Sequence, residues 1–311
     1  MMSNIIRLGN KCNQNCVFCT VALDNERELN TEETKDKIRF LAKRKAGSIT
    51  FTGGEPTLRE DLPELIKFAK DSGIEYVELQ TNAILLHRLS MAEKMIESGV
   101  DAVLVSLHSH NEKVSEILTG SPQTFKKTLQ GISNLTKLCK NVRISHVINS
   151  MNYKDLCDFV KFIKRGFPKV SYIYFSFVRP NGNALKNRWV VPKLSDIDLY
   201  VYRALDCCRS TGIHFGVEGI PLCYMQGFEE YSAELQRLLS KPVFYISDRT
   251  LKSDTHRYIK TNLKQKGESC EYCSLDDICC GVWKEYAELY GTGELFPVFV
   301  PKSDIIKKNK R

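Results

Sequence analysis

Short apolar runs alternate with amphipathic helical stretches over residues 5–178, and this alternation limits the folds open to the chain. Apolar strands separated by helices of this length indicate β-α-β units, whose strands lie parallel in one sheet with right-handed crossovers. The expected strands are residues 5–8, 48–53, 76–81, 101–107, 142–148 and 171–178. The expected helices are residues 32–45, 61–72, 88–98, 123–138 and 153–165. The sequence therefore predicts an α/β fold.

Six strands are too few for the closed eight-stranded barrel, so we expect a partial (β/α)6 parallel barrel or an open sheet. In both architectures, ligands bind at the carboxyl ends of the strands. The regular alternation stops after Gly182, and a region rich in cysteine follows. We therefore expect a core over residues 1–190, a small auxiliary domain over 191–300 and a basic tail over 301–311.

Composition and charge restrict the class of protein. The 311 residues are 42% hydrophobic, which is enough for a large core. We find no apolar run of signal-peptide or membrane-spanning length, so we expect a cytoplasmic protein without a membrane partner. The net charge is +8, and the terminal Lys307, Lys308, Lys310 and Arg311 supply four of these charges. The body is thus mildly basic, which allows a nucleic-acid partner but does not require one.

The cysteines fall into clusters rather than a disulfide pattern. Reducing conditions in the cytosol make metal binding or catalysis the commoner use of clustered thiols. The first cluster, Cys12, Cys16 and Cys19, directly follows the first expected strand. Three thiolates on so short a loop suit an iron-sulfur cluster with one iron left open. A zinc site with a distant fourth ligand, or a set of buried thiols, is the alternative.

The CxxxCxxC spacing of this cluster, with the aromatic Phe18 before the last cysteine, resembles the motif of the radical S-adenosylmethionine (SAM) superfamily. The turn Gly53-Gly54-Glu55-Pro56, which ends the second strand, is similar to the GGEP motif of that family. The resemblance implies that the open iron of a [4Fe-4S] cluster binds SAM. It further implies that one electron from a low-potential donor cleaves SAM, and that the resulting 5′-deoxyadenosyl radical abstracts hydrogen from a substrate.

The resemblance also implies which side chains hold SAM. Glycines let the backbone approach a ligand closely, and the Glu55 carboxylate would pair with the α-ammonium group of SAM. Alternatively, Glu55 is a helix-entry residue, Arg143 and Asn149 are solvated polar residues, and His108 either faces substrate or caps the next helix. The implied SAM-binding residues are Phe18, Gly53, Gly54, Glu55, Pro56, Asn82, Ser106, Arg143, Asn149 and Val178.

A second cysteine cluster lies near the end of the chain. Cys270, Cys273 and Cys279, with Cys223 upstream, would complete either a second [4Fe-4S] cluster or a zinc site. The run resembles part of the SPASM region of radical SAM peptide-modifying enzymes, in its shorter "twitch" form, because no cysteine follows Cys280. We expect a second [4Fe-4S] cluster on these four residues. The identity of the last ligand stays open among Cys207, Cys208, Cys279 and Cys280.

The resemblance to the SPASM region favours a substrate that is a peptide or a protein side chain. A nucleoside, tRNA or small metabolite is the alternative substrate. A third hypothesis is a non-catalytic iron-sulfur or zinc protein, which would need neither the GGEP turn of residues 53–56 nor an open coordination site.

Overall fold

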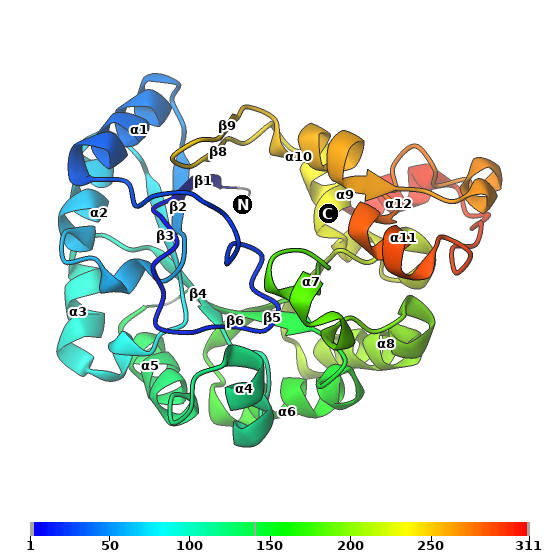
Figure 1. Ribbon diagram of the computed structural model, residues 1–311, viewed down its shortest axis with the longest axis horizontal. Coiled ribbons are helices and arrows are strands. Elements are labelled where there is room, and N and C mark those ends of the chain that lie inside the picture. The colour runs from blue at the N-terminus through cyan, green and yellow to red at the C-terminus, as the bar shows by residue number, and fades with distance from the viewer. Residues whose placement is uncertain (1–2, 140, 310–311) are drawn as a thin grey trace.

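The apolar runs of the sequence form a sheet of nine strands in the order β7-β6-β5-β4-β3-β2-β1-β8-β9, within residues 3–139 and 141–309, the part of the chain that this computed structural model describes. Strands β1 to β7 pair in parallel with their neighbours. Helices α1 to α6 surround the curved sheet on its outside (Figure 1). The predicted α/β partial barrel is confirmed.

The boundaries of the elements are as follows. The strands are β1 Asn4–Arg7, β2 Ser48–Thr52, β3 Tyr76–Thr81, β4 Ala102–Ser106, β5 Val142–Ile148, β6 Val170–Phe177, β7 His214–Glu218, β8 Tyr245–Ile246, β9 Leu251–Lys252, β10 Lys264–Gln265 and β11 Val282–Trp283. The α-helices are α1 Thr31–Lys43, α2 Leu62–Asp71, α3 Leu89–Glu97, α4 Glu112–Thr119, α5 Phe125–Leu138, α6 Leu156–Gly166, α7 Asn183–Lys186, α8 Leu194–Thr211, α9 Ala233–Leu238, α10 Thr255–Tyr258, α11 Lys284–Tyr290 and α12 Lys302–Asn309. Short helical turns include η1 Pro56–Leu58, η5 Leu222–Tyr224 and η8 Glu268–Tyr272.

Along β6, buried apolar side chains alternate with less buried side chains, so the two faces of the sheet differ. In β6, Ile173, Phe175 and Phe177 are buried on the face that packs against the helices. Tyr172 and Tyr174 point to the opposite face, because successive strand side chains alternate. That inner face of the barrel is the more polar one.

Both edges of the sheet come from segments that follow residue 190. Strand β7 pairs with β6 along one edge, and β8 pairs with β1 along the other, with Ile5 opposite Tyr245. Strands β8 and β9 form an antiparallel hairpin. The predicted boundary near 190 therefore falls inside a continuous sheet, and the prediction of six strands omitted β7.

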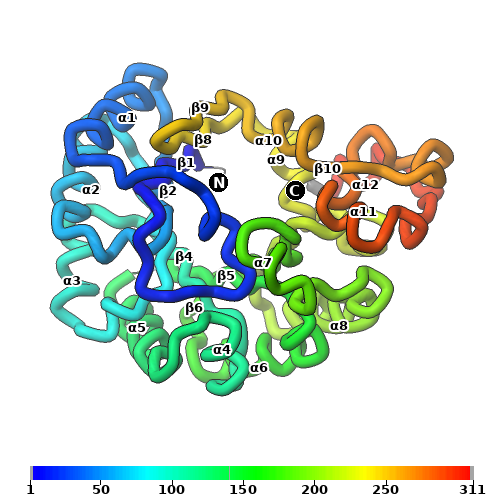
Figure 2. The backbone as a smooth tube through the Cα atoms, viewed as in Figure 1, coloured from blue at the N-terminus to red at the C-terminus, as the bar shows by residue number. Residues whose placement is uncertain are grey.

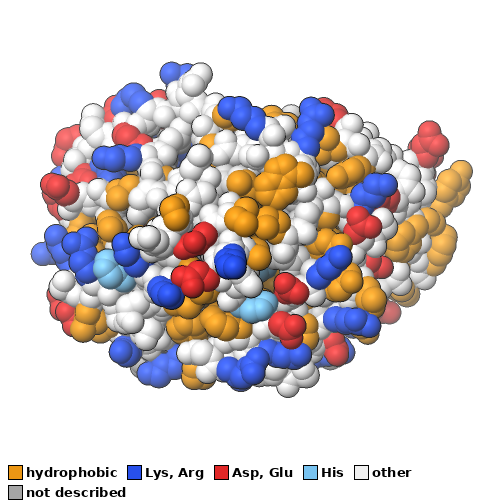
Figure 3. Space-filling view, turned by 60° about the horizontal axis from the view of Figure 1, so that its bottom comes forward, with side chains coloured by type: hydrophobic (Ala, Val, Ile, Leu, Met, Phe, Trp, Pro, Cys, Tyr) orange, Lys and Arg blue, Asp and Glu red, His pale blue; other side chains and the backbone are white. Residues whose placement is uncertain are grey.

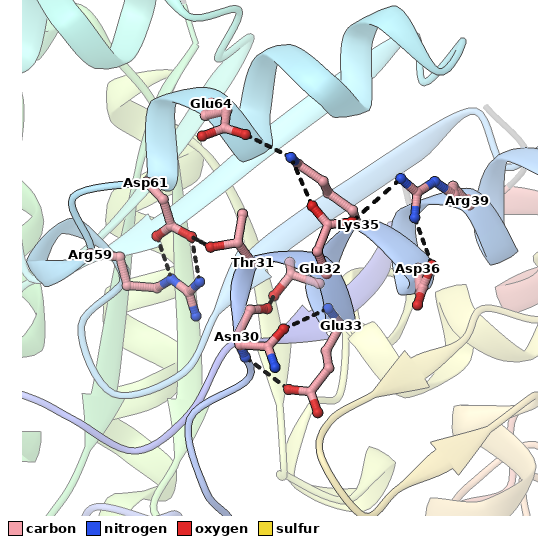
Figure 4. A network of polar contacts seen from close by, with 11 residues as sticks. Asn30, Thr31, Glu32, Glu33, Lys35, Asp36, Arg39, Arg59, Asp61 and Glu64 are labelled. Atoms are coloured by element: carbon pink, nitrogen blue, oxygen red, sulfur yellow. Dashed lines mark hydrogen bonds and ion pairs between the residues drawn. The ribbon is translucent and has the colours of Figure 1, made fainter.

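The loop between β1 and α1 crosses the end of the barrel at which the parallel strands finish. In Figure 2 it runs from β1 to the neighbourhood of α7 before it returns to α1. A capping box fixes its exit: the Asn30 side chain accepts the Glu33 N–H, and the Glu33 carboxylate accepts the Asn30 N–H (Figure 4). Beside it, the Thr31 hydroxyl donates to Asp61, which also pairs with Arg59 (Figure 4). The two ends of the loop are thus anchored to the sheet and to α2.

The C-terminal region forms α9 to α12 and the small β10–β11 sheet at one side of the barrel (Figure 1). Helix α12 occupies most of the predicted basic tail and buries Ile305. Lys310 and Arg311, which were part of that prediction, lie outside the described residues. Among the helices of the described chain, none has the length and apolar character needed to cross a membrane.

Candidate functional site

The three N-terminal cysteines lie on the loop that crosses the barrel end. Cys12 is exposed, whereas Cys16 and Cys19 are half-buried, and the Cys19 N–H donates to the Cys16 carbonyl at 3.0 Å. Burial raises the pKa of the Cys16 thiol, and the nearby Cys19 and Cys12 raise it further. The other two cysteines of the loop therefore act on the Cys16 thiol.

Their chemistry fits an iron-sulfur cluster, because thiolates are its usual protein ligands. Within residues 3–139 and 141–309, however, no group of three or more His, Cys, Asp or Glu side chains is already arranged to hold a metal ion. Cys12, Cys16 and Cys19 thus supply the donor atoms but not a finished coordination shell. Binding a cluster would also require the thiols to lose their protons.

The two glycines of the GGEP turn bring the cysteine loop against the end of β2. The Gly54 N–H donates to the Gly9 carbonyl at 2.9 Å, and the Glu55 N–H donates to the Lys11 carbonyl at 2.8 Å. A Cβ atom at Gly54 would lie 2.2 Å from the Lys11 oxygen, and one at Gly53 would lie 2.7 Å from the Gly9 oxygen. Glycine is therefore required at positions 53 and 54 for the cysteine loop to pack against the end of β2, independently of any contact between these glycines and SAM.

Glu55 is buried and caps the turn η1, in which Pro56 is the first residue. Its Oε1 atom accepts the Thr57 N–H at 3.0 Å and the hydroxyls of Thr57 and Thr81 at 2.6 Å each. Its Oε2 atom accepts the Asn82 N–H at 2.7 Å. Burial raises the pKa of this carboxyl against the effect of these bonds. The structure thus shows the helix-entry contacts, and one acceptor position of Oε2 is left for a further donor.

Asn82 links the end of β3 to the cysteine loop. Its Nδ2 atom donates to the Asn13 side chain at 2.7 Å, and its Oδ1 atom accepts the Ile84 N–H at 3.0 Å. The next residue, Ala83, has a φ of 58°, a left-handed conformation that favours glycine. The predicted residue Asn82 therefore lies beside the cysteines, but its amide is already used to hold their loop.

His108 and Phe18 meet at the end of β4. Their rings pack edge to face with centroids 4.9 Å apart. The Val147 N–H donates to Nδ1 of His108 at 3.0 Å, so the ring proton lies on Nε2, and burial lowers the pKa of His108 to about 4. The capping alternative for His108 is wrong, because the side chain of Asn111 caps the next helix, α4. His108 is a neutral imidazole that supports Phe18 of the cysteine loop.

Arg143 has a different neighbour from the predicted one. It is the second residue of β5, near the end of the barrel opposite the cysteine loop, and it forms an ion pair with Glu78 of β3. A guanidinium held by a carboxylate at that depth is not free to take the methionyl carboxylate of SAM. Arg143 is therefore occupied by Glu78 and is not part of the SAM site that we propose.

Three further predicted residues lie at strand ends. The Asn149 side chain closes the turn after β5, accepting the Met151 N–H at 3.0 Å and donating to the Val147 carbonyl at 2.9 Å. Val178 is buried just beyond β6 and donates its N–H to the Ile148 carbonyl at 3.0 Å. Ser106 ends β4 with its side chain half-buried. The amide of Asn149 is engaged in the turn and Val178 is almost fully buried, so Ser106 is the residue of these three whose side chain is partly exposed.

The C-terminal cysteines gather around one pocket. Its lining includes Cys223, Cys270, Cys273 and Cys279, together with Lys266 and Phe296. The Val298 N–H donates to the Cys273 sulfur at 3.3 Å, and the Gly281 N–H donates to the Cys279 sulfur at 3.4 Å. Burial raises the pKa of Cys223 to about 12. Four thiols around one cavity, with amide groups directed at sulfur, fit a cluster or zinc site.

The other candidate ligands lie elsewhere. Cys280 lines a neighbouring pocket with Glu234. Cys207 and Cys208 are buried on α8, where the Cys207 thiol is 3.7 Å from the Cys157 carbonyl of α6. Cys223, Cys270, Cys273 and Cys279 thus line one pocket that Cys207, Cys208 and Cys280 do not line, and their role as ligands stays a prediction.

Sequence reasoning missed the polar residues that follow β6. Asn183 and Asn187 donate to carbonyls of the cysteine loop. The run Asn181-Gly182-Asn183, a few residues after the end of β6, was an available signal, because functional loops follow strand ends in this architecture.

Two curated proteins are similar in sequence to part of this chain. A protein described as a probable GTP 3′,8-cyclase from Sulfolobus acidocaldarius is 30% identical over 198 residues, which cover 62% of this chain and 61% of that protein. The Fe-coproporphyrin III synthase of Methanosarcina barkeri is 37% identical over 149 residues, covering 47% of this chain and 37% of that protein. The chain thus spans less than two thirds of the length of these curated relatives.

Two solved structures share the fold over almost the whole chain. SuiB of Streptococcus suis bound to SAM has a TM-score of 0.66 at 19% identity, covering 95% of this chain and 76% of that one. The protein anSMEcpe with bound SAM has a TM-score of 0.67 at 16% identity, covering 99% and 95%. The model of the radical SAM superfamily, whose members use a [4Fe-4S] cluster and SAM, matches residues 6–163, just over half of the chain. The chain therefore belongs to the radical SAM superfamily.

Proposed function

We propose that Cys12, Cys16 and Cys19 hold a [4Fe-4S] cluster and that the chain uses it to cleave SAM to a 5′-deoxyadenosyl radical. The cluster would supply the electron, and its open iron would hold the amino and carboxylate groups of SAM. The observation that carries the proposal is the packing of the cysteine loop on the GGEP turn, through the Glu55 N–H and the Lys11 carbonyl at 2.8 Å. That contact brings the two family motifs to one end of the barrel.

The residues around the cysteines have distinct tasks in this proposal. Glu55 keeps one acceptor position for the α-ammonium group of SAM, while Asn82 and Asn13 hold the loop in place. Ser106 would bond the ribose hydroxyls, and Val178 would contact the adenine. Phe18 and His108 pack beneath the loop and exclude water from that side.

For the substrate, we propose a peptide or a protein side chain. Two solved structures of the same fold, SuiB with its precursor peptide SuiA and anSMEcpe with a peptide, hold substrates of this kind. The aligned region also includes the cysteine-rich C-terminal part of this chain, since the match covers 99% of it. We propose that Cys223, Cys270, Cys273 and Cys279 hold a second [4Fe-4S] cluster there, with zinc as the alternative metal.

A nucleotide or small metabolite is the second candidate. Curated relatives described as GTP 3′,8-cyclases support it, and so does the polar inner face of the barrel, which carries Glu78, Gln80 and Arg143. On the face shown in Figure 3, Lys and Arg side chains are interspersed with Asp and Glu rather than gathered in one basic patch, so that face gives no support for a large nucleic-acid partner.

The test is turnover by the anaerobically reconstituted chain, reduced with dithionite and given SAM. We expect slow release of 5′-deoxyadenosine and methionine. Release of S-adenosylhomocysteine alone would indicate methyl transfer and contradict the proposal. Deuterated peptide or deuterated GTP can then be added separately, and deuterium in the released 5′-deoxyadenosine identifies the class of substrate that gives up hydrogen.

A further inference from the structure

The segment of residues 179–187, here called the β6 strut, packs directly on the cysteine loop (Figure 1). Gly182 has a φ of 56°, and a Cβ atom there would lie 2.2 Å from the Cys19 carbonyl oxygen. The next residue, Asn183, donates its backbone N–H to that same oxygen at 2.9 Å. Only glycine lets the strut come this close, so the contact is built into the sequence.

Two side chains of the β6 strut complete the contact. Nδ2 of Asn183 donates to the Cys16 carbonyl at 2.9 Å, and Nδ2 of Asn187 donates to the Val17 carbonyl at 3.1 Å. A peptide unit is planar, so a bond that fixes a carbonyl also fixes the N–H on the other side of that unit. The β6 strut therefore sets the orientation of successive peptide groups between Cys16 and Cys19.

The other end of the β6 strut is tied to the C-terminal region. Arg179 pairs with Glu285 of α11 at 2.5 Å, and the two side chains are 21% and 22% exposed. The Arg179 guanidinium also lies 4.8 Å from the ring centroid of Trp283. Trp283 follows closely after Cys279, whose sulfur accepts the Gly281 N–H. One short segment thus contacts the protein around both groups of cysteines.

We propose that Asn183 and Asn187 are positioning residues for the N-terminal cluster, and that the Arg179–Glu285 pair transmits the placement of the C-terminal region to the cysteine loop. The inference rests on the proposed function, because it assigns a cluster to Cys12, Cys16 and Cys19. It adds that the geometry of that cluster depends on residues more than 150 positions later in the chain.

The experiment compares Asn183→Ala with Asn262→Ala in the reconstituted full chain. Both amides donate to a backbone carbonyl, but Asn262 is exposed and bonds to Tyr258. The readout is the change that SAM produces in the electron paramagnetic resonance spectrum of the reduced protein, since only a cluster with an open iron responds. The substitution removes the part-buried bond to the Cys16 carbonyl and an exposed bond to the Asn15 side chain. We expect Asn183→Ala to keep its iron, to alter the SAM-bound spectrum and to weaken SAM binding about tenfold, the effect of about one lost hydrogen bond. Asn262→Ala should match the unsubstituted chain.

The role of the Arg179–Glu285 pair is tested with Glu285→Gln. The control is Arg209→Gln, which breaks the exposed Arg209–Asp206 pair on α8. We expect Glu285→Gln to alter the SAM-dependent spectrum, in the same direction as Asn183→Ala, and Arg209→Gln to leave it unchanged. If Asn183→Ala and Glu285→Gln lower only the melting temperature, with the spectrum and SAM affinity intact, the β6 strut is structural and the inference is wrong. If the unsubstituted chain shows no response to SAM, the cluster assignment itself has failed and the inference falls with it.

Discussion

The Glu55 carboxylate accepts the backbone N–H of Asn82 at 2.7 Å, and this bond ties the end of β2 to the end of β3. The same carboxylate accepts three further bonds at its other oxygen. Glu55 therefore holds two strand ends together while one acceptor position stays open.

Glu55→Gln should affect both folding and SAM binding. An amide places an N–H group against one of the donors that now face the carboxylate, so the free energy of unfolding should fall by about 1–3 kcal/mol. Loss of the charge should weaken SAM binding about ten- to a hundredfold. Thr57→Val is the control, because it removes one hydroxyl donor to Glu55 and keeps the charge. Calorimetry measures the stability of both variants, and SAM titration measures their affinity for SAM. If Glu55→Gln binds SAM with unchanged affinity, Glu55 serves only to cap η1.

Iron content tests the ligand set of the C-terminal pocket. The reconstituted chain should bind about eight irons, as two [4Fe-4S] clusters. Replacing Cys270 and Cys273 together by Ala should remove about half of these irons. The remaining N-terminal cluster should still respond to SAM. The paired replacement of Cys207 and Cys208, which lie against α6, should remove none. One cluster's worth of iron together with co-purifying zinc would show that the pocket is a zinc site.

Gly54→Ala should disturb the cysteine loop through sterics alone. The new Cβ atom would meet the Lys11 carbonyl oxygen at 2.2 Å, so the loop must move and the Glu55 N–H must lose its acceptor. We expect a loss of about 1–3 kcal/mol in stability and poor retention of the N-terminal cluster. Gly47→Ala is the matched control, because nothing lies within 4 Å of its added Cβ atom. Normal iron content in Gly54→Ala would show that the loop tolerates displacement.

Stability should fall on mild acidification because of His146. This buried residue of β5 packs against α6, with its ring centroid 4.1 Å from that of Phe159, and burial lowers its pKa from 6.5 to about 3. The unfolded chain takes up a proton below pH 6.5 and the folded chain does not, so stability is full above 6.5 and declines toward pH 3. At pH 5 the loss should be about 2 kcal/mol.

The variant His146→Leu should lose less stability than the unsubstituted chain between pH 7.5 and pH 5, as measured by urea denaturation. His108, whose pKa is lowered to about 4, should retain its share of the pH dependence in that variant. Equal losses in both proteins would mean that His146 does not remain neutral in the folded state.

Apolar runs and amphipathic periodicity in the sequence predicted the strands and helices that depend on neighbouring residues. The apolar run of β6 and the amphipathic α6 are visible in any short window of the sequence. Strand β7 was missed because His214 and Gly216 interrupt its apolar character, and it is held by pairing with β6. The cysteine spacing and the GGEP turn were visible for the same local reason.

Contacts between distant residues could not be predicted in this way. Nothing in the sequence around Arg143 indicates that it forms an ion pair with Glu78, two strands away in the sheet. The four bonds that occupy Glu55 come from Thr57 of η1, from Thr81 at the end of β3 and from Asn82, which follows that strand. These partners depend on the register of the sheet, which is fixed only when the barrel closes around its core.

The position of β8 beside β1 has a consequence for any shortened form of the protein. A fragment that stops near residue 190 would lack β7 and β8 together, so β6 and β1 would each present a row of unpaired N–H and C=O groups to solvent. Such rows recruit strands from other molecules and promote aggregation. The segments that follow residue 190 therefore shield both edges of the barrel from self-association, and a minimal soluble fragment would have to extend at least through Ile246.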